Sequence, residues 1–299
     1  MSVDSQLQYE ARVRTRQAVV AGAAAVLLLG SAVIQLAGPH TTVSEVTLGL
    51  IFEHRRFALD IVGAVLQAGG WAALAWTLWF LFRCTRAREE RVQRFIGYFA
   101  LAGAPLAAIG IIGYVISYGV VAQQFVTHGA QTYPQANHLM GAASLSIFQI
   151  IDYLGELLLA VGFVMVSLNA MRVGLLTRFL GFLGIIGGVL TLFVITPVPI
   201  VQFYWLAALA YLFTGRWPSG VPPAWRSGRA ERWPSAQEAR QQQARARGQG
   251  GRAKALTRDA VPEPVGAGGG GGGSSSGDGN GSTRSGASRS NKRKRKRRR

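Results

Sequence analysis

Long apolar runs in residues 1–215 restrict this chain to a small number of fold classes. A helix needs about 20 residues, with roughly 17 to 25 tolerated, to cross the hydrocarbon core of a bilayer. The runs extend approximately over residues 17–37, 57–82, 95–121, 145–168, 179–195 and 198–213. They predict an all-α, polytopic membrane protein, built as a six-transmembrane-helix bundle.

Two of these assignments have alternatives. The last two runs are continuous and are divided at Pro197-Val198-Pro199, because two prolines remove two backbone donors and favour a tight reversal. One long kinked helix is the alternative. The first run could instead be a cleaved secretory signal, but it has the length of a span and no small-x-small cleavage site follows Leu36.

The cations next to the runs predict the orientation of the helices, because Lys and Arg are retained on the cytoplasmic side. The connections on one side contain Arg12, Arg14, Arg16, Arg83, Arg86, Arg88, Arg91, Arg94, Arg172 and Arg178. The opposite connections contain only Arg55 and Arg56. We therefore expect an even number of spans, with a cytoplasmic N-terminal segment (1–16), a transmembrane domain (17–215) and a cytoplasmic C-terminal tail (216–299).

The tail differs from the rest of the chain in composition. It contains most of the net charge of +18, an unbroken Gly tract at residues 268–273 and a closing KRKRKRRR sequence. Such a sequence cannot bury enough apolar surface to offset chain entropy, so the tail is expected to be mostly disordered. A capping-box pattern at Ser235–Glu238 predicts one solvated helix within it.

The end of the tail is predicted to contact anionic lipid head groups, since each cation near an anionic leaflet contributes about 1 kcal/mol. These cations are Lys292, Arg293, Lys294, Arg295, Lys296, Arg297, Arg298 and Arg299. A solubilising, topology-fixing tail without a defined partner is the alternative. Nucleic acid is less favoured as a partner, because no aromatic residue is interleaved to stack on a base.

Acidic residues at membrane depth are the most informative candidates for function, because a charge at the bilayer centre costs about 2.5–3.5 kcal/mol. Neighbouring polar residues at helical spacing complete a predicted intramembrane polar site. Its members are Asp60, Gln67, Gln149, Asp152, Tyr153 and Glu156. We expect the three acids to line a cavity open to the outside, suited to proton-coupled transport; hydrogen-bonded contacts between helices are the alternative.

No motif indicates catalysis, a cofactor or a metal site, so enzymatic activity has no support. His40, His54, His128 and His138 lie in outward connections without metal-binding spacing, and the single cysteine, Cys84, excludes an intrachain disulfide. A capping box at Thr42–Glu45 predicts a short helix on the outer membrane surface. Gly184 and Gly188 form a GxxxG pattern that favours close helix packing within the bundle. The sequence does not specify an oligomeric state.

Residues 1–215 resemble a bacterial family of integral membrane proteins catalogued as domain of unknown function 4386. The resemblance rests on RRFALDIVGAVLQ, on IIDYLGELLLAVGFVMVSLNAMRVGLLTRFLGFLGIIGGVL and on the long uncharged outer loop between the third and fourth spans. The segments around Trp225 and Trp233 resemble tails of high-GC bacterial homologues, which agrees with the excess of Arg over Lys. The resemblance implies a bacterial inner-membrane location and a six-helix fold, but no activity.

Two classes of function therefore remain after the sequence is read. The first is a small-solute or proton-coupled transporter, or a sensor, that uses the acidic residues in the spans. The second is a non-catalytic membrane protein whose basic tail binds anionic lipid or a cytoplasmic partner.

Overall fold

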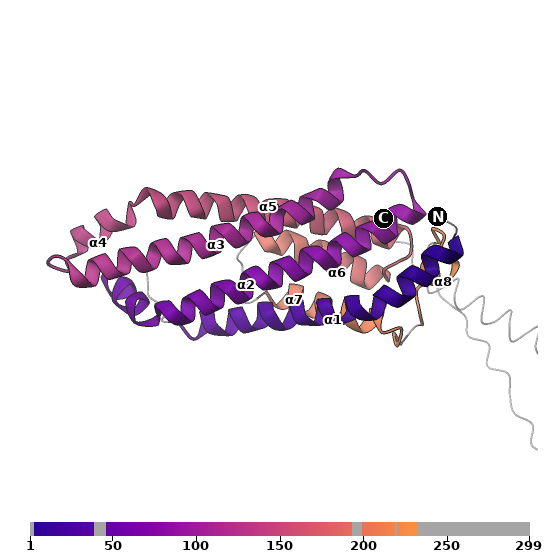
Figure 1. Ribbon diagram of the computed structural model, residues 1–299, viewed down its shortest axis with the longest axis horizontal. Helices are drawn as coiled ribbons and strands as arrows, with labels where there is room; N and C mark the ends of the chain where they lie inside the picture. Colours follow the sequence, from indigo (N-terminus) through magenta and orange to yellow (C-terminus); the bar gives the residue numbers. More distant parts are fainter. Residues whose placement is uncertain (1–2, 39–45, 193–198, 219, 232–299) are drawn as a thin grey trace, which may run out of the picture. The chain divides into compact units, whose positions relative to one another are not determined.

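A computed structural model describes residues 3–38, 46–192, 199–218 and 220–231, and within these ranges all regular secondary structure is helical (Figure 1). The helices are α1 (Val3–Leu36), α2 (Val46–Arg88), α3 (Phe95–Thr127), α4 (Tyr133–Met140), α5 (Ala143–Arg172), α6 (Arg178–Leu192), α7 (Ile200–Phe213) and α8 (Pro223–Ser227). The predicted capping boxes at Thr42–Glu45 and Ser235–Glu238, most of the Pro197–Pro199 turn and the basic end lie outside the described residues.

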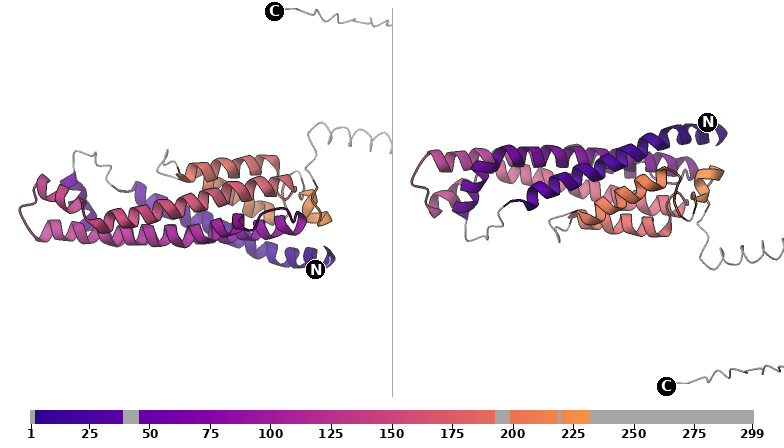
Figure 2. Two further views of the ribbon diagram at one scale, coloured as in Figure 1. Left: turned by 90° about the horizontal axis from the view of Figure 1, so that it is seen from above. Right: turned by 90° about the horizontal axis from the view of Figure 1, so that it is seen from below.

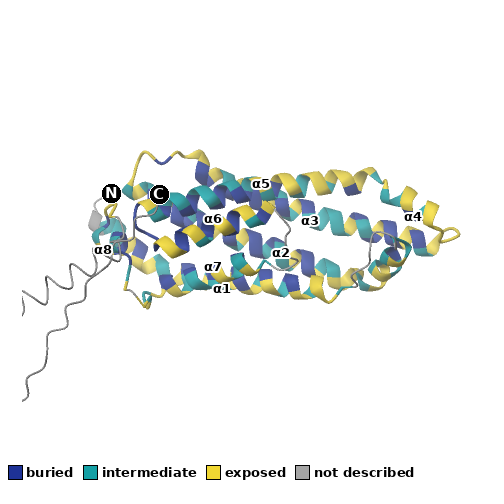
Figure 3. Cartoon of the chain, turned by 180° about the vertical axis from the view of Figure 1, so that it is seen from behind, coloured by how far each residue is buried: buried dark blue, intermediate teal, exposed yellow. Residues whose placement is uncertain are grey.

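Four helices, α1, α2, α3 and α5, are long and apolar enough to cross a membrane. Many large apolar side chains on their outer faces are exposed, among them Val19, Val62 and Ile150 (Figure 3). Exposed apolar surface of this kind is what a lipid environment accepts and water does not.

The fifth and sixth predicted spans are two short helices, α6 with 15 residues and α7 with 14. They run antiparallel and side by side (Figure 2); α6 lies along the half of α5 that is nearer to its C-terminal end, and α7 packs against α6 and α1. The Gln202 amide donates to Gly187 O at 3.1 Å, and the Trp205 indole donates to Leu180 O at 2.9 Å. The structure therefore has a helical hairpin here, and not one kinked helix.

α2 begins well before the second predicted span. The prediction of a separate surface helix ending near Ile51 is wrong, because residues from Val46 onward belong to α2. Arg56 explains why the helix continues through cationic residues. Its guanidinium donates to Ile34 O at 2.9 Å and to Ala37 O at 2.6 Å. Two of its nitrogen atoms thus donate to carbonyl groups at the C-terminal end of α1, while Nε is buried without a hydrogen-bond partner among the described residues.

α3 and α5 pack backbone against backbone. A Cβ atom added to Gly103 would lie 2.5 Å from Leu159 N, and one added to Gly162 would lie 2.5 Å from Ala100 N. At Gly155 it would overlap Ala107 N, and at Gly110 it would overlap the backbone of Asp152. Small residues at these positions let the two helices approach more closely than any side chain would permit.

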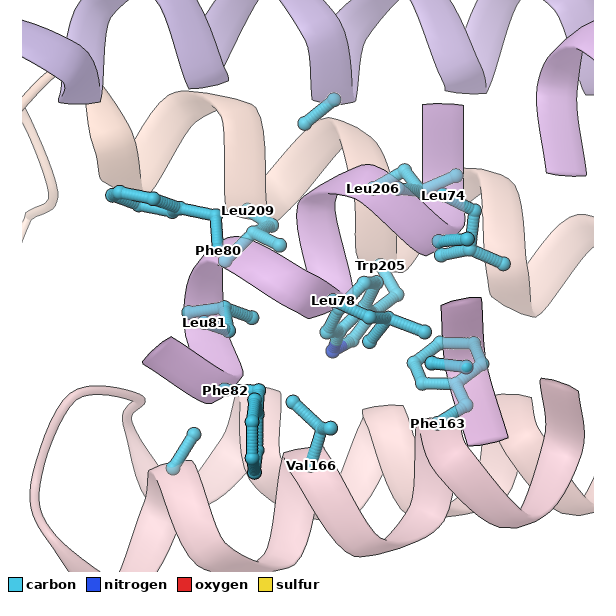
Figure 4. Close-up of a cluster of buried hydrophobic side chains, with 14 of the residues drawn as sticks. Leu74, Leu78, Phe80, Leu81, Phe82, Phe163, Val166, Trp205, Leu206 and Leu209 are labelled. Atoms are coloured by element: carbon cyan, nitrogen blue, oxygen red, sulfur yellow. The ribbon is translucent and has the colours of Figure 1, made fainter. Parts of the chain in front are cut away.

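The main hydrophobic core fills the half of the bundle that contains the cation-rich ends of the helices. It joins α2 to α5 and α7 through large side chains such as Leu78, Phe163 and Trp205 (Figure 4). A second, smaller cluster lies at the opposite end, where Leu50, Phe125 and Ala136 join α2, α3 and α4. Two separate clusters leave the intervening stretch of α2 and α3 without a continuous apolar core.

The packed part of the chain continues past residue 215, where the tail was predicted to begin. Trp225 of α8 is buried in the main core, and its indole donates to Leu175 O at 2.9 Å. Arg88, whose side chain is fully buried, donates to Ala224 O and forms a bidentate ion pair with Glu10 at 2.8 and 2.6 Å. α8 is therefore fixed to α1 and α2, and the Arg88–Glu10 pair satisfies a charge that would be costly if left alone.

We expect Gly155→Ala to destabilise the protein although Ala favours helix by about 1 kcal/mol over Gly. The added methyl group overlaps Ala107 N and forces α3 and α5 apart, so a net loss of about 1–3 kcal/mol is expected. Gly22→Ala is the matched control, because nothing lies within 4 Å of a Cβ atom there. Unfolding of both variants in detergent measures the effect. Equal stability of the two would contradict the proposed contact.

A chain ending after residue 215 is expected to lose about 3–5 kcal/mol of stability, because a fully packed aromatic side chain, Trp225, leaves the core. A chain ending after Glu231 keeps that residue and is expected to unfold within about 0.5 kcal/mol of the full-length protein. Thermal unfolding of the two truncated chains, compared with the full-length chain, tests both expectations. A stable chain ending at residue 215 would show that α8 does not belong to the folded unit.

Candidate functional site

A cavity of about 300 Å³ lies between α1, α2 and α3. Along α2 it occupies the stretch between the two hydrophobic clusters, from Glu53 to Gln67, and along α3 the stretch from Ile111 to Tyr118. α1 contributes Ile34 and Gln35 near its C-terminal end. The cavity therefore lies between the main hydrophobic core on one side and the smaller cluster near α4 on the other.

Two carboxyl groups from α2 line this cavity. Glu53 and Asp60 are seven residues apart, which places them on one face of the helix, and both line the cavity. Arg56, between them, lies 3.8 Å from Asp60 Oδ1. The same guanidinium donates hydrogen bonds to carbonyl groups at the end of α1, so it contacts both that helix end and Asp60.

A network of neutral polar groups continues the lining toward the main core. The Gln35 amide donates to Gln67 Oε1 at 2.7 Å and to Ser31 Oγ at 3.2 Å. Tyr114 and Tyr118 form the wall from α3, with stacked rings whose centroids are 6.0 Å apart. The cavity thus combines carboxylate, amide and aromatic surfaces that could bind a small polar molecule.

The structure separates the predicted site residues into two groups. Asp60 and Gln67 line the cavity, together with the small residues Gly63 and Ala64 between them. Gln149, Asp152, Tyr153 and Glu156 lie on α5 and do not contribute to its lining. The three acids are therefore not brought together in this cavity; the backbone of Asp152 instead packs against Gly110 of α3.

The four α5 residues have distinct surroundings. The Gln149 amide donates to Tyr153 Oη at 3.2 Å on the exposed side of the helix. Asp152 and Glu156 are partly buried, and Asp152 Oδ1 is buried without a hydrogen-bond partner among the described residues. Neither carboxyl group has an ion-pair partner within the described ranges.

Sequence reasoning did not include several residues that form the cavity. The cavity is also lined by Glu53, Gln35, Tyr114 and Tyr118. Glu53 precedes the apolar run that was predicted to start at residue 57, and the other three lie within predicted apolar runs. The seven-residue spacing of Glu53, Asp60 and Gln67 was the available signal, because it marks one face of a continuous helix. It was hidden by the cations at residues 55 and 56, which indicated the end of a span.

The described histidines do not gather into a metal site. His54 lies in α2, His128 follows α3 and His138 lies in α4, while His40 is outside the described residues. In the ranges that the structure covers, no group of three or more His, Cys, Asp or Glu side chains could hold a metal ion.

Comparison with protein-family models, with curated proteins and with solved structures found no match to this chain.

A cysteine placed in the cavity should react with a charged, water-soluble thiol reagent, because the thiolate is the reactive species and forms only where water enters. We expect Gln67→Cys to be modified at least about tenfold faster than Ile150→Cys, whose side chain faces outward from α5. The native Cys84 is buried and leaves a low background. Equal rates at the two positions, measured by mass spectrometry, would show that water does not enter the cavity.

Proposed function

We propose that the protein is a six-helix, multi-pass protein of the bacterial inner membrane that binds a small cationic solute, with proton coupling, as a transporter or sensor. The observation that carries the proposal is the cavity between the two hydrophobic clusters, in which Glu53 and Asp60 face a wall of tyrosine rings. A volume of about 300 Å³ corresponds to the small end of ligand sites in proteins.

The proposed orientation has both termini in the cytoplasm. The cation-rich ends of α1, α2 and α5 would lie inside, which follows the positive-inside rule. α6 and α7 run antiparallel, so this pair returns to the side from which it starts and keeps both termini on one side. The cavity then belongs to the outer half of the bundle, beyond the main core.

A cation is the favoured solute because of the charges that face the cavity. Glu53 and Asp60 provide two carboxyl groups, and the single cation beside them, Arg56, is already used by Ile34 O and Ala37 O. Tyrosine faces attract ammonium groups through the ring quadrupole. Two neighbouring carboxyl groups favour the uptake of one proton, because like charges repel, and binding of a cation would release that proton.

Asp60→Asn and Glu53→Gln are expected to remove binding of small ammonium ions. Methylammonium and tetramethylammonium should raise the unfolding temperature of the purified protein, because a ligand at 100 times its Kd stabilises by about 2.7 kcal/mol. Each variant should lose that rise, since the carboxylate that pairs with the cation is gone. Thermal unfolding at increasing ammonium concentration, with sodium chloride at matched ionic strength, is the measurement.

Glu156→Gln is the matched control, because it neutralises an acid that does not line the cavity. It should keep the full response to ammonium ions. Proteoliposomes that contain a pH-sensitive dye extend the experiment to transport. Tetramethylammonium is used here because it has no neutral form that crosses the bilayer by itself, and an imposed gradient of it should move protons only where Asp60 is intact. A response that Asp60→Asn leaves unchanged would refute the cavity as the binding site.

The second candidate function places activity in the basic tail. Its closing eight residues are all Lys or Arg, and α8 fixes the start of the tail to the cation-rich end of the bundle. Anionic lipid or a cytoplasmic partner would then be bound next to the inner membrane surface. Removal of residues 232–299 separates the two candidates: a retained ammonium response with lost cellular function favours the tail.

A further inference from the structure

A second cavity, of about 490 Å³, lies between the N-terminal part of α1 and the C-terminal part of α2. It is lined by residues from Gln6 to Gln17 on α1 and from Trp76 to Ala87 on α2. These are the cation-rich ends of both helices, so in the proposed orientation the cavity lies at the inner membrane surface. It is distinct from the solute cavity, which lies beyond the main core.

Gln17 is the group that indicates a ligand in this cavity. The residue is 5% exposed, and its Oε1 atom is buried and accepts no hydrogen bond from the described residues. A buried amide oxygen without a donor costs about 1–3 kcal/mol. A ligand with a hydroxyl or amine donor in the cavity would remove that cost.

Arg83 supplies an available positive charge at the same cavity. The carboxylate of the lining, Glu10, is paired with Arg88 and is therefore neutralised. Arg83 is exposed and forms no ion pair with any residue in the described ranges. Among the side chains that the structure describes, the cavity therefore presents a cation without an ion pair and an acceptor without a donor.

Aromatic residues form another part of the lining. Trp76 is 54% exposed, while Trp79 packs against Phe82 and Tyr98 with ring centroids 5.5 and 5.7 Å away. Tryptophan at a helix end is typical of the membrane–water interface, where the ring contacts both acyl chains and head groups. A ligand that lies here would extend from a polar pocket onto a lipid-facing aromatic surface.

We propose that this cavity binds one anionic glycerophospholipid of the inner leaflet whose head group carries hydroxyl groups. The phosphodiester pairs with the Arg83 guanidinium, and a head-group hydroxyl donates to Gln17 Oε1. The acyl chains lie along Trp76 and the outer face of α2. The proposal uses the orientation given above but does not depend on the solute cavity.

Binding of phosphatidylglycerol to the purified full-length protein, followed by native mass spectrometry, tests the role of Arg83. An ionic strength of about 0.5 M screens exposed charges, including those of the tail. Arg83→Gln is expected to weaken binding by about tenfold or more, as for a hydrogen bond to a charged group. Arg86→Gln is the matched control, since Arg86 lies on the same turn but does not line the cavity, and it should change binding by less than about twofold.

The role of Gln17 is tested with two lipids of equal charge. Phosphatidylmethanol has the same phosphodiester but no hydroxyl group, so the native protein should bind phosphatidylglycerol about threefold to tenfold more tightly. Gln17→Leu should bind both lipids equally, and Gln17→Met provides a second variant of similar shape. Thermal unfolding of both variants verifies that the cavity is intact.

Three outcomes would overturn the proposal. Equal losses in Arg83→Gln and Arg86→Gln would show non-specific attraction of anionic lipid. A preference for phosphatidylglycerol that survives in both Gln17 variants would remove the head-group contact. Binding of soluble glycerol phosphate as tight as that of phosphatidylglycerol would identify a site for free phosphate esters, because the acyl chains would then contribute nothing.

Discussion

The backbone contact between α3 and α5 is the constraint on which the rest of the bundle depends. Helices in lipid gain little from hydrophobic burial against one another, so their association relies on close van der Waals packing. Gly103, Gly110 and Gly155 remove the side chains that would otherwise separate the two axes. On the same helix, α3, Tyr114 and Tyr118 line the cavity together with residues of α1 and α2.

Much of this architecture could be predicted from the sequence, for a simple physical reason. Apolar length is a local property, and the starts of α3 and α5 lie within two residues of the predicted runs. The stripe of Asp60, Gly63, Ala64 and Gln67 on one helix face is also local, and all four residues line the cavity. Which residues α1 and α3 place opposite that stripe depends on tertiary packing, so Gln35 and Tyr114 could not be identified in advance.

The arginines make contacts that could not be predicted from the sequence. The positive-inside rule treats every cation near a span as a marker of orientation, and it assigned Arg56 and Arg88 accordingly. In the structure, Arg88 instead joins Glu10, 78 positions away, to Ala224, 136 positions away. Arg56 joins the end of α1 to the acidic pair of α2. Partners so distant in the chain leave no local pattern that a sequence could reveal.

The position of Trp225 in the main core has a consequence for the order of assembly. Membrane helices enter the bilayer as they are synthesised, and domains generally fold as units with N-terminal parts first. Here the N-terminal helix, α1, and the last described helix, α8, meet at Arg88. The Arg88–Glu10 ion pair can form once α2 has been made, whereas the contact of Arg88 with Ala224 O can form only after residue 224 has been translated. A nascent chain therefore carries Arg88 without its Ala224 contact until the C-terminal segment has been made, so an interrupted chain differs from a longer one in the hydrogen bonding of Arg88.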